Sequence, residues 1–382
     1  MNLSGKLLII LLRAGMQIEQ VNNKYVAGLS VVQKISLDKA HAEQIWNAVY
    51  RLSAKQGILA ITWDGLQRLI EAGAIPTECL PRRALKLQWC YNVEQIERMY
   101  VKQRKVITEL SSYFTEHGIR MMLLKGYGLS LCYPVPQHRP YGDIDIWLYG
   151  RQKEADALLR RERGIAVDED KHHHTVFHLN GVMVENHYDF LNVHSHRSNR
   201  EIDRLLKHYA ESESGETIYL DGTPIRLPCA DFNALFLLRH AAVHFAAIEI
   251  GLRHVADWAM FVGRYYDQID WSALERTAKF QNMDRSLHCL NAISIDFLGL
   301  DAAKIPPFKR DEALERRVLN EIIAPEFSVQ APKGGGLAEA LMFKTRRWWA
   351  NRWKHRIVYR EGLIRTFLVQ IQSHLLKPKS LK

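Results

Sequence analysis

The segment 142–147 alternates acidic and apolar side chains in the order Gly-Asp-Ile-Asp-Ile-Trp. Because successive side chains of a strand point to opposite faces, this pattern predicts a strand with Asp143 and Asp145 on one face and Ile144 and Ile146 in the core. Two carboxylates on one face repel each other unless a divalent cation lies between them. Mg²⁺ prefers such oxygen ligands, often together with substrate phosphates. The segment therefore predicts a metal-binding strand.

A third acid lies on a predicted β-hairpin. Two alternating runs, 175–179 and 182–188, are joined by Asn180-Gly181, a pair that favours a tight type I′ turn. On the second run Glu185 and His187 share a face. If this run pairs beside the first strand, Glu185 completes a three-carboxylate cluster and becomes the candidate general base for an acceptor hydroxyl. A two-ion site of this kind stabilises both oxygens in nucleotidyl transfer.

A candidate phosphate loop precedes the acidic strand. The short β-like run 119–124 ends at Lys125-Gly126, and a brief helical turn is predicted at 129–133. A glycine at this point lets backbone N–H groups approach a phosphate closely, and a helix N-terminus favours an anion. Lys125 and Arg139, the latter in a Pro-rich loop, are candidates to add positive charge against a triphosphate. The predicted nucleotide-binding residues are therefore Lys125, Gly126 and Arg139.

Helical periodicity surrounds this centre on both sides. Helices are predicted from about 36 to 118, with Leu37-Asp38 as a cap and a long helix from about 84 that closes at His117-Gly118. Further helices are predicted at 154–163, 235–248, 252–265 and 271–280. The sequence thus predicts an α+β fold, with a small mixed β-sheet core flanked by N-terminal and C-terminal helical regions.

A chain of this length favours more than one domain. Pro306-Pro307 and the glycine-rich segment 333–336 are the best linker candidates. The predicted parts are an N-terminal helical region at 1–118, an α/β core at 119–230, a helical domain packing on the core at 231–330, and a basic amphipathic helical tail at 331–382.

Composition excludes several classes of protein. Hydrophobic residues are 47% of the chain and charged residues 25%, as in an ordinary soluble protein. The apolar run 7–12 is far shorter than the roughly 20 residues that cross a bilayer, so it predicts a buried helix rather than a signal peptide or transmembrane segment. The five cysteines have no paired spacing, which argues against disulfides and a Cys-based zinc site and makes a reducing cytoplasm the expected location.

The net charge of +10 comes from the segment 331–382, which holds 12 Lys/Arg and two acids. Its basic residues interleave with Trp348, Trp349 and Trp353. The first interpretation is an amphipathic helix whose tryptophans pack on the body while its basic face meets water. The alternative is an anionic partner, either nucleic acid or an anionic membrane surface.

The ordered combination of loop, acidic strand and third acid resembles the polymerase-β-type nucleotidyltransferase superfamily, and more narrowly its bacterial uncharacterised nucleotidyltransferase family. The resemblance covers roughly residues 40–310, from the helical lead-in onward, and leaves the basic tail outside. The segments that carry it are Leu123-Leu124-Lys125-Gly126, Tyr133-Pro134, Arg139, Gly142-Asp143-Ile144-Asp145, Val184-Glu185-Asn186-His187, and a downstream helix pair with His244, Arg253 and Asp257.

By this resemblance Asp143 and Asp145 are metal ligands, Glu185 is the third acid and metal ligand, and Gly126 is the phosphate-loop glycine. The implied function is transfer of a nucleoside monophosphate from a nucleoside triphosphate such as ATP to an unidentified acceptor, with release of pyrophosphate. The implied cofactor is Mg²⁺, with Mn²⁺ as the alternative. One position departs from the superfamily: Tyr127 follows the loop glycine, where Gly or Ser is usual.

Two other functions stay open. The first is a nucleotidyltransferase-like fold without turnover that serves as a binding or regulatory module, an alternative motivated by Tyr127 and by the basic, Trp-rich tail. The second is a metal-dependent phosphohydrolase that uses the same acids together with histidines. It predicts release of phosphate rather than pyrophosphate.

Histidines are dense between residues 172 and 196, and imidazole is a common metal ligand. His172-His173-His174 is predicted in a polar loop, and His194-Ser195-His196 lacks the helical spacing of a zinc motif, so a dedicated zinc site is the minor interpretation. His187 is a further candidate for the acidic site. Arg253 and Asp257 are four residues apart, which favours a helical ion pair over a ligand-binding role.

Overall fold

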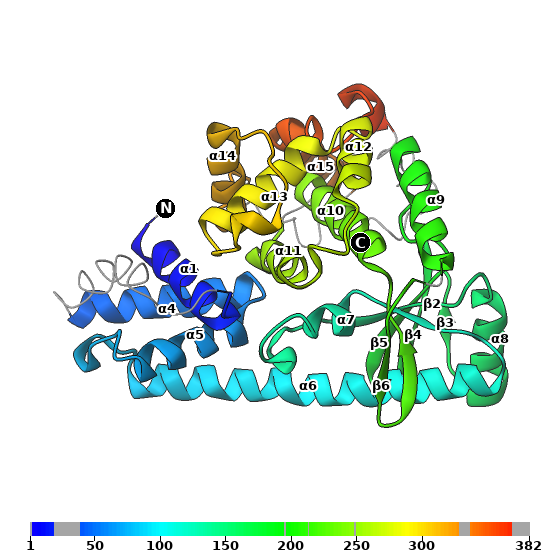
Figure 1. The fold of residues 1–382 in the computed structure, drawn as a ribbon, viewed down its shortest axis with the longest axis horizontal. Coiled ribbons are helices and arrows are strands. Elements are labelled where there is room, and N and C mark those ends of the chain that lie inside the picture. The colour runs from blue at the N-terminus through cyan, green and yellow to red at the C-terminus, as the bar shows by residue number, and fades with distance from the viewer. Residues whose placement is uncertain are drawn as a thin grey trace.

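The computed structural model describes residues 2–18, 39–194, 196–212, 214–247, 250–327 and 337–368. Figure 1 shows the sheet near one end of the long helix α6 (Arg83–Glu116), the N-terminal helices near its other end, and a group of helices from the second half of the chain above both. The predicted cap Leu37-Asp38 and the linker candidate 333–336 lie outside the described residues.

Seven strands within this part of the chain form one mixed sheet, in the order β3-β4-β5-β2-β1-β7-β6. Strand β2 is parallel to β5, and β1 is parallel to β7, whereas the other neighbours are antiparallel. The predicted α+β fold is confirmed. The strands are β1 (Met122–Leu124), β2 (Asp143–Trp147), β3 (Val167–Asp168), β4 (His174–Leu179), β5 (Val182–His187), β6 (Thr217–Leu220) and β7 (Thr223–Arg226).

The helices follow the predicted periodicity closely on both sides of the sheet. The structure adds α9, α13 and α14, and it starts α7 at the loop glycine itself rather than at the predicted residue 129. The helices are α1 (Leu3–Met16), α4 (Lys39–Lys55), α5 (Leu59–Glu71), α6 (Arg83–Glu116), α7 (Gly126–Ser130), α8 (Gln152–Arg163), α9 (Arg197–Glu211), α10 (Ala230–Ala247), α11 (Leu252–Tyr265), α12 (Trp271–Phe280), α13 (Asp284–Asp296), α14 (Glu312–Ile323) and α15 (Leu337–His355).

The hairpin turns follow from residues that tolerate positive φ. Asn180 and Gly181 have φ of 52° and 69°, as a type I′ turn requires at both central positions, so the predicted β4–β5 turn is confirmed. Asp221 and Gly222, with φ of 51° and 83°, make the same kind of turn between β6 and β7. That second hairpin was not predicted. It extends the sheet on the side away from β5.

Helix α6 connects two hydrophobic cores. Its 34 residues extend over about 50 Å at 1.5 Å per residue. Leu85 and Trp89 near its start belong to a core shared by the N-terminal helices and by α10–α14. Leu110 and Phe114 near its end belong to a second core under the sheet. The N-terminal and C-terminal helices therefore share one interior. The predicted domain boundaries stay a prediction.

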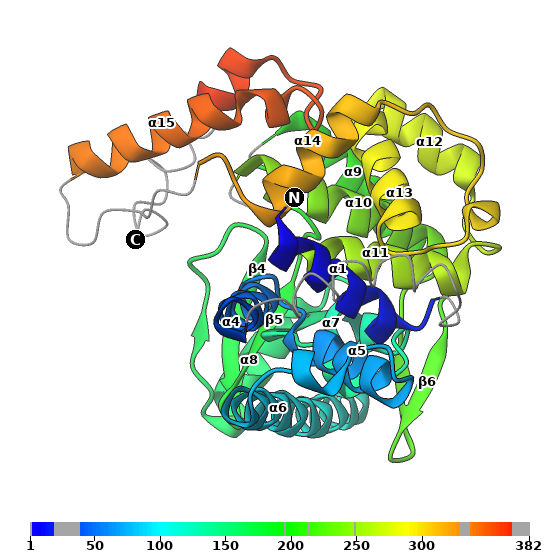
Figure 2. The same ribbon diagram turned by 90° about the vertical axis from the view of Figure 1, so that its left-hand side faces the viewer.

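The apolar run near the N-terminus forms a buried helix, as predicted. Figure 2 shows α1 lying across α5. The two helices touch at small residues: a Cβ on Gly65 of α5 would lie 1.8 Å from the carbonyl oxygen of Leu11. Leu7, Leu8, Leu11 and Leu12 have no exposed side-chain surface. No helix of the described ranges has both the length and the apolar character to cross a membrane.

The segment after α15 is part of the body rather than an appendage. Ile357, Val358 and Tyr359 are buried in the core that contains α10. Trp353 packs edge-on against a phenylalanine of α10 at 5.5 Å, whereas Trp349 is 61% exposed. The tryptophans thus follow the first interpretation in part. A nucleic acid or anionic membrane partner for the exposed basic face stays a prediction.

The five cysteines, all within the described ranges, form no disulfide, and Cys79 and Cys289 are buried. Burial raises the pKa of the Cys132 thiol to about 12, and burial likewise raises the pKa of the Cys289 thiol to about 12. Both groups are therefore protonated thiols at neutral pH, which makes them weak nucleophiles. A cytoplasmic location stays a prediction.

Candidate active site

Pairing between β2 and β5 brings the acidic residues together. The two strands are parallel, and Asp145 lies directly opposite Glu185 in their register. One ligand atom from each of Asp145, Glu185 and His187 lies within 4.8 Å of the other two. Asp143, two residues earlier on β2, lines the same cavity. The pairing on which the three-carboxylate prediction depended is therefore present.

Asp145 is the most deeply buried of these acids, with 2% of its surface exposed. The Lys125 ammonium lies 3.0 Å from its Oδ1, and His187 Nε2–H donates to the same oxygen at 2.9 Å. Burial alone would raise the pKa of Asp145, but Lys125 and His187 outweigh it and lower the pKa far below its ordinary value. The carboxylate is therefore ionised at neutral pH.

His187, which from the sequence was only a further candidate, contacts both Asp145 and Glu185 in the cluster. Burial opposes its protonation, but hydrogen bonds to Asp145 and Glu185 raise its pKa to about 9. In contrast, burial and the neighbouring negative charge of Asp145 raise the pKa of Asp143. Asp143 thus binds a proton more readily than Asp145, and Lys125 and His187 supply positive charge beside them. A bound cation would change the pKa values of all these groups.

The phosphate-loop prediction falls on strained backbone. Lys125 has φ of 35° and ψ of −127°, which a residue with a Cβ rarely adopts, and Gly126 follows with φ of 22°. A Cβ on Gly126 would lie 3.2 Å from a ring carbon of Tyr141. The position therefore requires glycine both for its φ and for the close approach of the ring. Strain concentrated at one turn is typical of functional sites.

Tyr127 packs away from the cavity. Its ring stacks on that of Tyr100, with centroids 5.1 Å apart and planes 24° from parallel, and its side chain belongs to the core under the sheet. It is not among the residues that line the acidic cavity. The bulky residue after the loop glycine therefore does not fill the space in front of Lys125-Gly126.

Arg139 is held inside the protein. Its guanidinium donates to both carboxylate oxygens of Asp257, at 2.9 and 2.7 Å, and Nη1 donates to the Gly126 carbonyl at 3.1 Å. The Tyr133 hydroxyl donates to the same carboxylate at 2.8 Å. This geometry gives Arg139 a positioning role behind the loop, and direct contact with a phosphate stays a prediction. The expected Arg253–Asp257 helical pair is replaced by this one, and Arg253 donates to a loop carbonyl instead.

The acids open into a cavity of about 720 Å³. Its opposite wall comes from α10, α11 and the segment after α15. Burial lowers the pKa of the histidines on that wall, so their rings are neutral at pH 7. The residues that face the acids from this wall are His240, His244, Arg253, His254 and Tyr359.

A sequence profile of the family described as "Uncharacterised nucleotidyltransferase" matches residues 42–299, about two thirds of the chain. The chain belongs to this family. A solved structure, the "Crystal structure of an antigenic nucleotidyltransferase-like protein from Paracoccidioides brasiliensis", is similar at 14% identity over 42% of this chain and 74% of that chain, with a TM-score of 0.30. No curated protein matches. The family confirms the nucleotidyltransferase resemblance, while a bacterial source and the polymerase-β superfamily stay predictions.

The family match ends before the C-terminal segment, yet that segment reaches the cavity through Tyr359. Tyr359 also lies 4.9 Å from the guanidinium of the fully buried Arg239. Arg239 in turn donates to the side chain of Asn199 on α9 and to the backbone carbonyl of Val358. Residues outside the matched region therefore complete the site, which the sequence analysis did not foresee.

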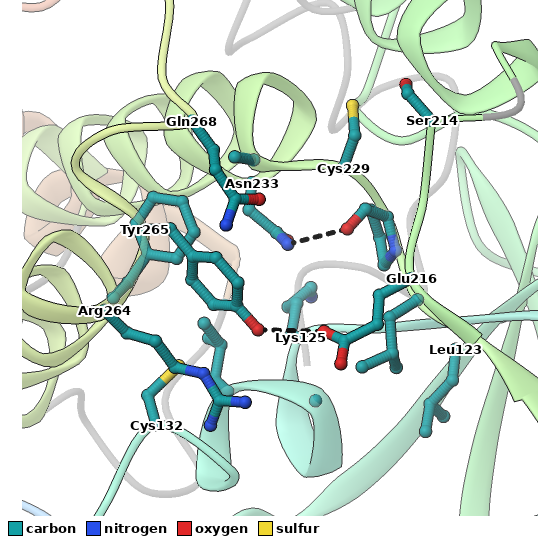
Figure 3. Close-up of a pocket in the computed structure, with 16 residues that line it drawn as sticks. Leu123, Lys125, Cys132, Ser214, Glu216, Cys229, Asn233, Arg264, Tyr265 and Gln268 are labelled. Carbon is teal, nitrogen blue, oxygen red and sulfur yellow. Dashed lines mark hydrogen bonds between the residues drawn. The ribbon is translucent and has the colours of Figure 1, made fainter. Parts of the chain in front are cut away.

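A second, smaller cavity of about 330 Å³ lies next to the first, and Lys125 and Leu129 line both. Figure 3 shows this cavity between α7, α11 and the start of β6, with the Tyr265 hydroxyl donating to Glu216 across it at 3.0 Å. The side chain of Gln268 points into the same space. Glu216, Tyr265 and Gln268 were not predicted as site residues.

Proposed function

We propose that the chain is a Mg²⁺-dependent nucleotidyltransferase that moves a nucleoside monophosphate from a nucleoside triphosphate, such as ATP, to a hydroxyl-bearing acceptor. The observation that carries the proposal is the β2–β5 register, which sets Asp145 opposite Glu185, with Asp143 on the same strand face, beside a strained glycine loop. These groups line one cavity that is large enough for a nucleotide.

The donor set fits a hard cation. Asp143, Asp145 and Glu185 offer carboxylate oxygens, which Mg²⁺ prefers and Mn²⁺ also accepts. The Asp145 carboxylate is ionised, and a divalent ion would compete with Lys125 and His187 for it. When bound, the ion supplies positive charge that neutralises the phosphate oxygens.

The chain's own residues then have distinct tasks. Lys125 adds positive charge at the loop, and backbone N–H groups beside Gly126 approach the triphosphate. Arg139 holds that loop through the Gly126 carbonyl. Glu185, with 18% of its side chain exposed, takes the proton from the acceptor hydroxyl. The acceptor oxygen bonds to the α-phosphorus, and the bond from that phosphorus to the bridging oxygen of pyrophosphate breaks.

The first test is binding. We expect calorimetry to detect nucleoside triphosphate binding that requires Mg²⁺, and we expect Asp143→Asn/Asp145→Asn to lose it at least tenfold. The exposed Asp267→Asn is the matched control and should bind as the unaltered chain does. Equal binding by the double variant would exclude the site.

The second test separates the reaction types. Triphosphates labelled at the α-phosphate are incubated with a mixture of candidate acceptors, and the release of pyrophosphate and of phosphate is measured. Label transfer with pyrophosphate release supports the proposal. Phosphate release alone would instead indicate the phosphohydrolase.

One observation favours the alternative of a binding module without turnover. Asp145 has two cationic partners, Lys125 and His187, so its charge is neutralised without any metal. In this alternative triphosphate binding would be independent of Mg²⁺, and no label would reach any acceptor. The buried position of Tyr127 removes one of the two sequence motives for that alternative, because its ring leaves the loop open, whereas the basic, Trp-rich tail remains as the other.

A further inference from the structure

Three imidazole rings gather beside the acids. The ring centroids of His173 and His174 are 4.4 Å apart, and those of His173 and His187 and of His174 and His187 are 5.6 and 5.1 Å apart. One ring nitrogen from each of the three lies within 4.8 Å of the others. The prediction that 172–174 forms a polar loop is wrong at its end, because His174 opens β4 and is buried.

The backbone places these rings without help from a ligand. His174 and His187 are a directly opposed pair across the antiparallel β4–β5 ladder, which brings their side chains close together on one face. His173 lies just before the strand, so strand alternation does not turn it to the other face. Its carbonyl accepts the backbone N–H groups of Tyr188 and Asp189, both at 3.1 Å. The cluster is therefore anchored to both sides of the hairpin.

The cluster has unused ligand atoms. The Nδ1 atoms of His173 and His174 are buried and have no hydrogen-bond partner among the described residues. Buried polar groups are normally paired, so two unpaired nitrogens in one cluster need an explanation. A ring nitrogen without a hydrogen bond has a lone pair or a proton that is free to exchange for a metal ion.

We propose that His173, His174 and His187 form a Zn²⁺ site, with Glu185 as the fourth ligand. Glu185 Oε1 lies 3.4 Å from His174 Nε2, and Glu185 Oε2 lies 3.5 Å from His187 Nε2, so Glu185 can join an ion that these two nitrogens bind. Three imidazoles and a carboxylate suit Zn²⁺, which favours four ligands of this kind, whereas Mg²⁺ favours oxygen alone. The site goes beyond the proposed function, because it does not require nucleotide.

Zinc at this site would compete with the acids for shared groups. His187 is the partner of Asp145, and Glu185 is the candidate base. An ion that takes both would withdraw a proton donor from Asp145 and the base from the acceptor. We therefore expect Zn²⁺ to inhibit any transfer reaction while it binds, without displacing Mg²⁺ from Asp143.

The test is a Zn²⁺ titration of tag-free full-length protein against a chromophoric chelator at pH 7. We expect one tightly bound Zn²⁺, retained in a large excess of Mg²⁺. His173→Ala and His174→Ala should each weaken binding at least tenfold. The control His178→Ala removes an exposed histidine from the same strand and should bind as the unaltered chain does. Circular dichroism of each variant checks that it is folded.

Two further measurements make the result specific. Co²⁺ substituted for Zn²⁺ should give the intense visible absorption of a four-coordinate ion, and the histidine variants should lose it. Asp143→Asn/Asp145→Asn should keep Zn²⁺ binding, so a failure of nucleotide binding and a failure of this site are distinguishable. The proposal is overturned if the unaltered chain binds no Zn²⁺, if the histidine variants bind it equally well, or if only the Asp variants lose it.

Discussion

The buried Arg139–Asp257 pair connects the loop at Gly126 to α11, so at the residue scale it links two separate elements of the cavity wall. Two parallel hydrogen bonds to one carboxylate and a third to the Gly126 carbonyl use the planar fork of arginine, which lysine lacks. Removing one member of a buried pair leaves the other as an uncompensated charge. Stability and loop geometry should therefore change together.

Arg139→Met should lower the free energy of unfolding by about 3–5 kcal/mol, the usual cost of breaking a buried ion pair. Arg139→Lys should restore part of that stability but leave nucleotide affinity weakened, because the loop carbonyl loses its donor. Urea unfolding and calorimetry measure the two effects. Arg151→Lys is the control, since the Arg151–Glu154 pair is bidentate but exposed, and it should change stability by less than about 1 kcal/mol. Unchanged stability in Arg139→Met would contradict the account.

His355 makes stability depend on pH. Burial, reinforced by the positive charges of His196 and Lys354, lowers its pKa to about 4, below the value of about 6.5 in an unfolded chain. Between these values the unfolded chain binds a proton that the folded chain does not, so stability falls as the pH falls from about 6.5 to 4. For this residue alone the loss is at most about 3 kcal/mol.

His355→Asn should therefore unfold with a shallower pH dependence than the unaltered chain. Urea unfolding at pH 7, 6, 5 and 4 measures the slope. The exposed His208→Asn should keep the original slope, because its ring is in solvent in both states. A variant at residue 355 with the original slope would mean that other buried histidines carry the effect.

At this scale strand alternation predicted which face of each strand Asp143, Asp145 and Glu185 occupy, and all three line one cavity. The partner of Asp257 could not be predicted. A helical spacing of four favoured Arg253, whereas the observed partner comes from a loop 118 residues earlier in the chain. The spacing of residues along a helix predicts contacts within that helix. It does not predict a contact with a side chain from a distant part of the chain. His174 was misplaced for a related reason, since a polar residue directly before a predicted strand is easily assigned to the loop.

At the scale of elements, the contact between α1 and α5 depends on glycine. Gly65→Ala should lower the free energy of unfolding by about 1–3 kcal/mol, as overpacking does, because the new Cβ would meet the Leu11 carbonyl. Gly263→Ala in α11 is the matched control, since a Cβ there meets only an ordinary contact at 3.7 Å. It should be neutral or stabilising by up to about 1 kcal/mol, as expected for a helix interior. Urea unfolding of both variants makes the comparison, and equal effects would refute the close-contact argument.

The strands and helices that were predicted have strong hydrophobic periodicity. Several elements that were missed also have a turn pair or a periodic pattern in the sequence. Asp221-Gly222 favours the same turn as Asn180-Gly181, yet the short flanking strands hid the hairpin. Helix α9 has apolar residues at 202, 206 and 210, at helical spacing. Strand order could not be predicted from local periodicity. From the sequence, the β2–β5 pairing could be stated only as a condition, because contacts between distant segments decide which strands pair.

At the scale of the whole molecule, a buried pair attaches α15 to the helical body. Lys354 Nζ lies 2.6 Å from Glu321 Oε1 of α14, and both side chains are almost completely buried. Glu321→Gln should cost about 3–5 kcal/mol, because the ammonium loses its charged partner. Glu321→Met/Lys354→Met should recover most of that loss, since no buried charge remains.

Urea unfolding gives these energies, and nucleotide binding shows whether the cavity wall at Tyr359 loosens with the pair. The control is Glu312→Gln on the same helix, whose partner Arg316 is exposed. It should cost less than about 1 kcal/mol. A double variant that is no more stable than Glu321→Gln would show that the pair itself contributes net stability.

The position of Tyr359 in the cavity wall also sets an order of events during translation. The strands that carry the carboxylates leave the ribosome long before residue 359 is added. Folding generally follows the order of synthesis, so the sheet and its acids can form while the cavity still lacks a wall. A nascent chain stalled before this residue would display its acidic groups to solvent without an enclosed place for a ligand. The wall at Tyr359 is therefore complete only when α15 and the segment directly after it have been translated and have docked.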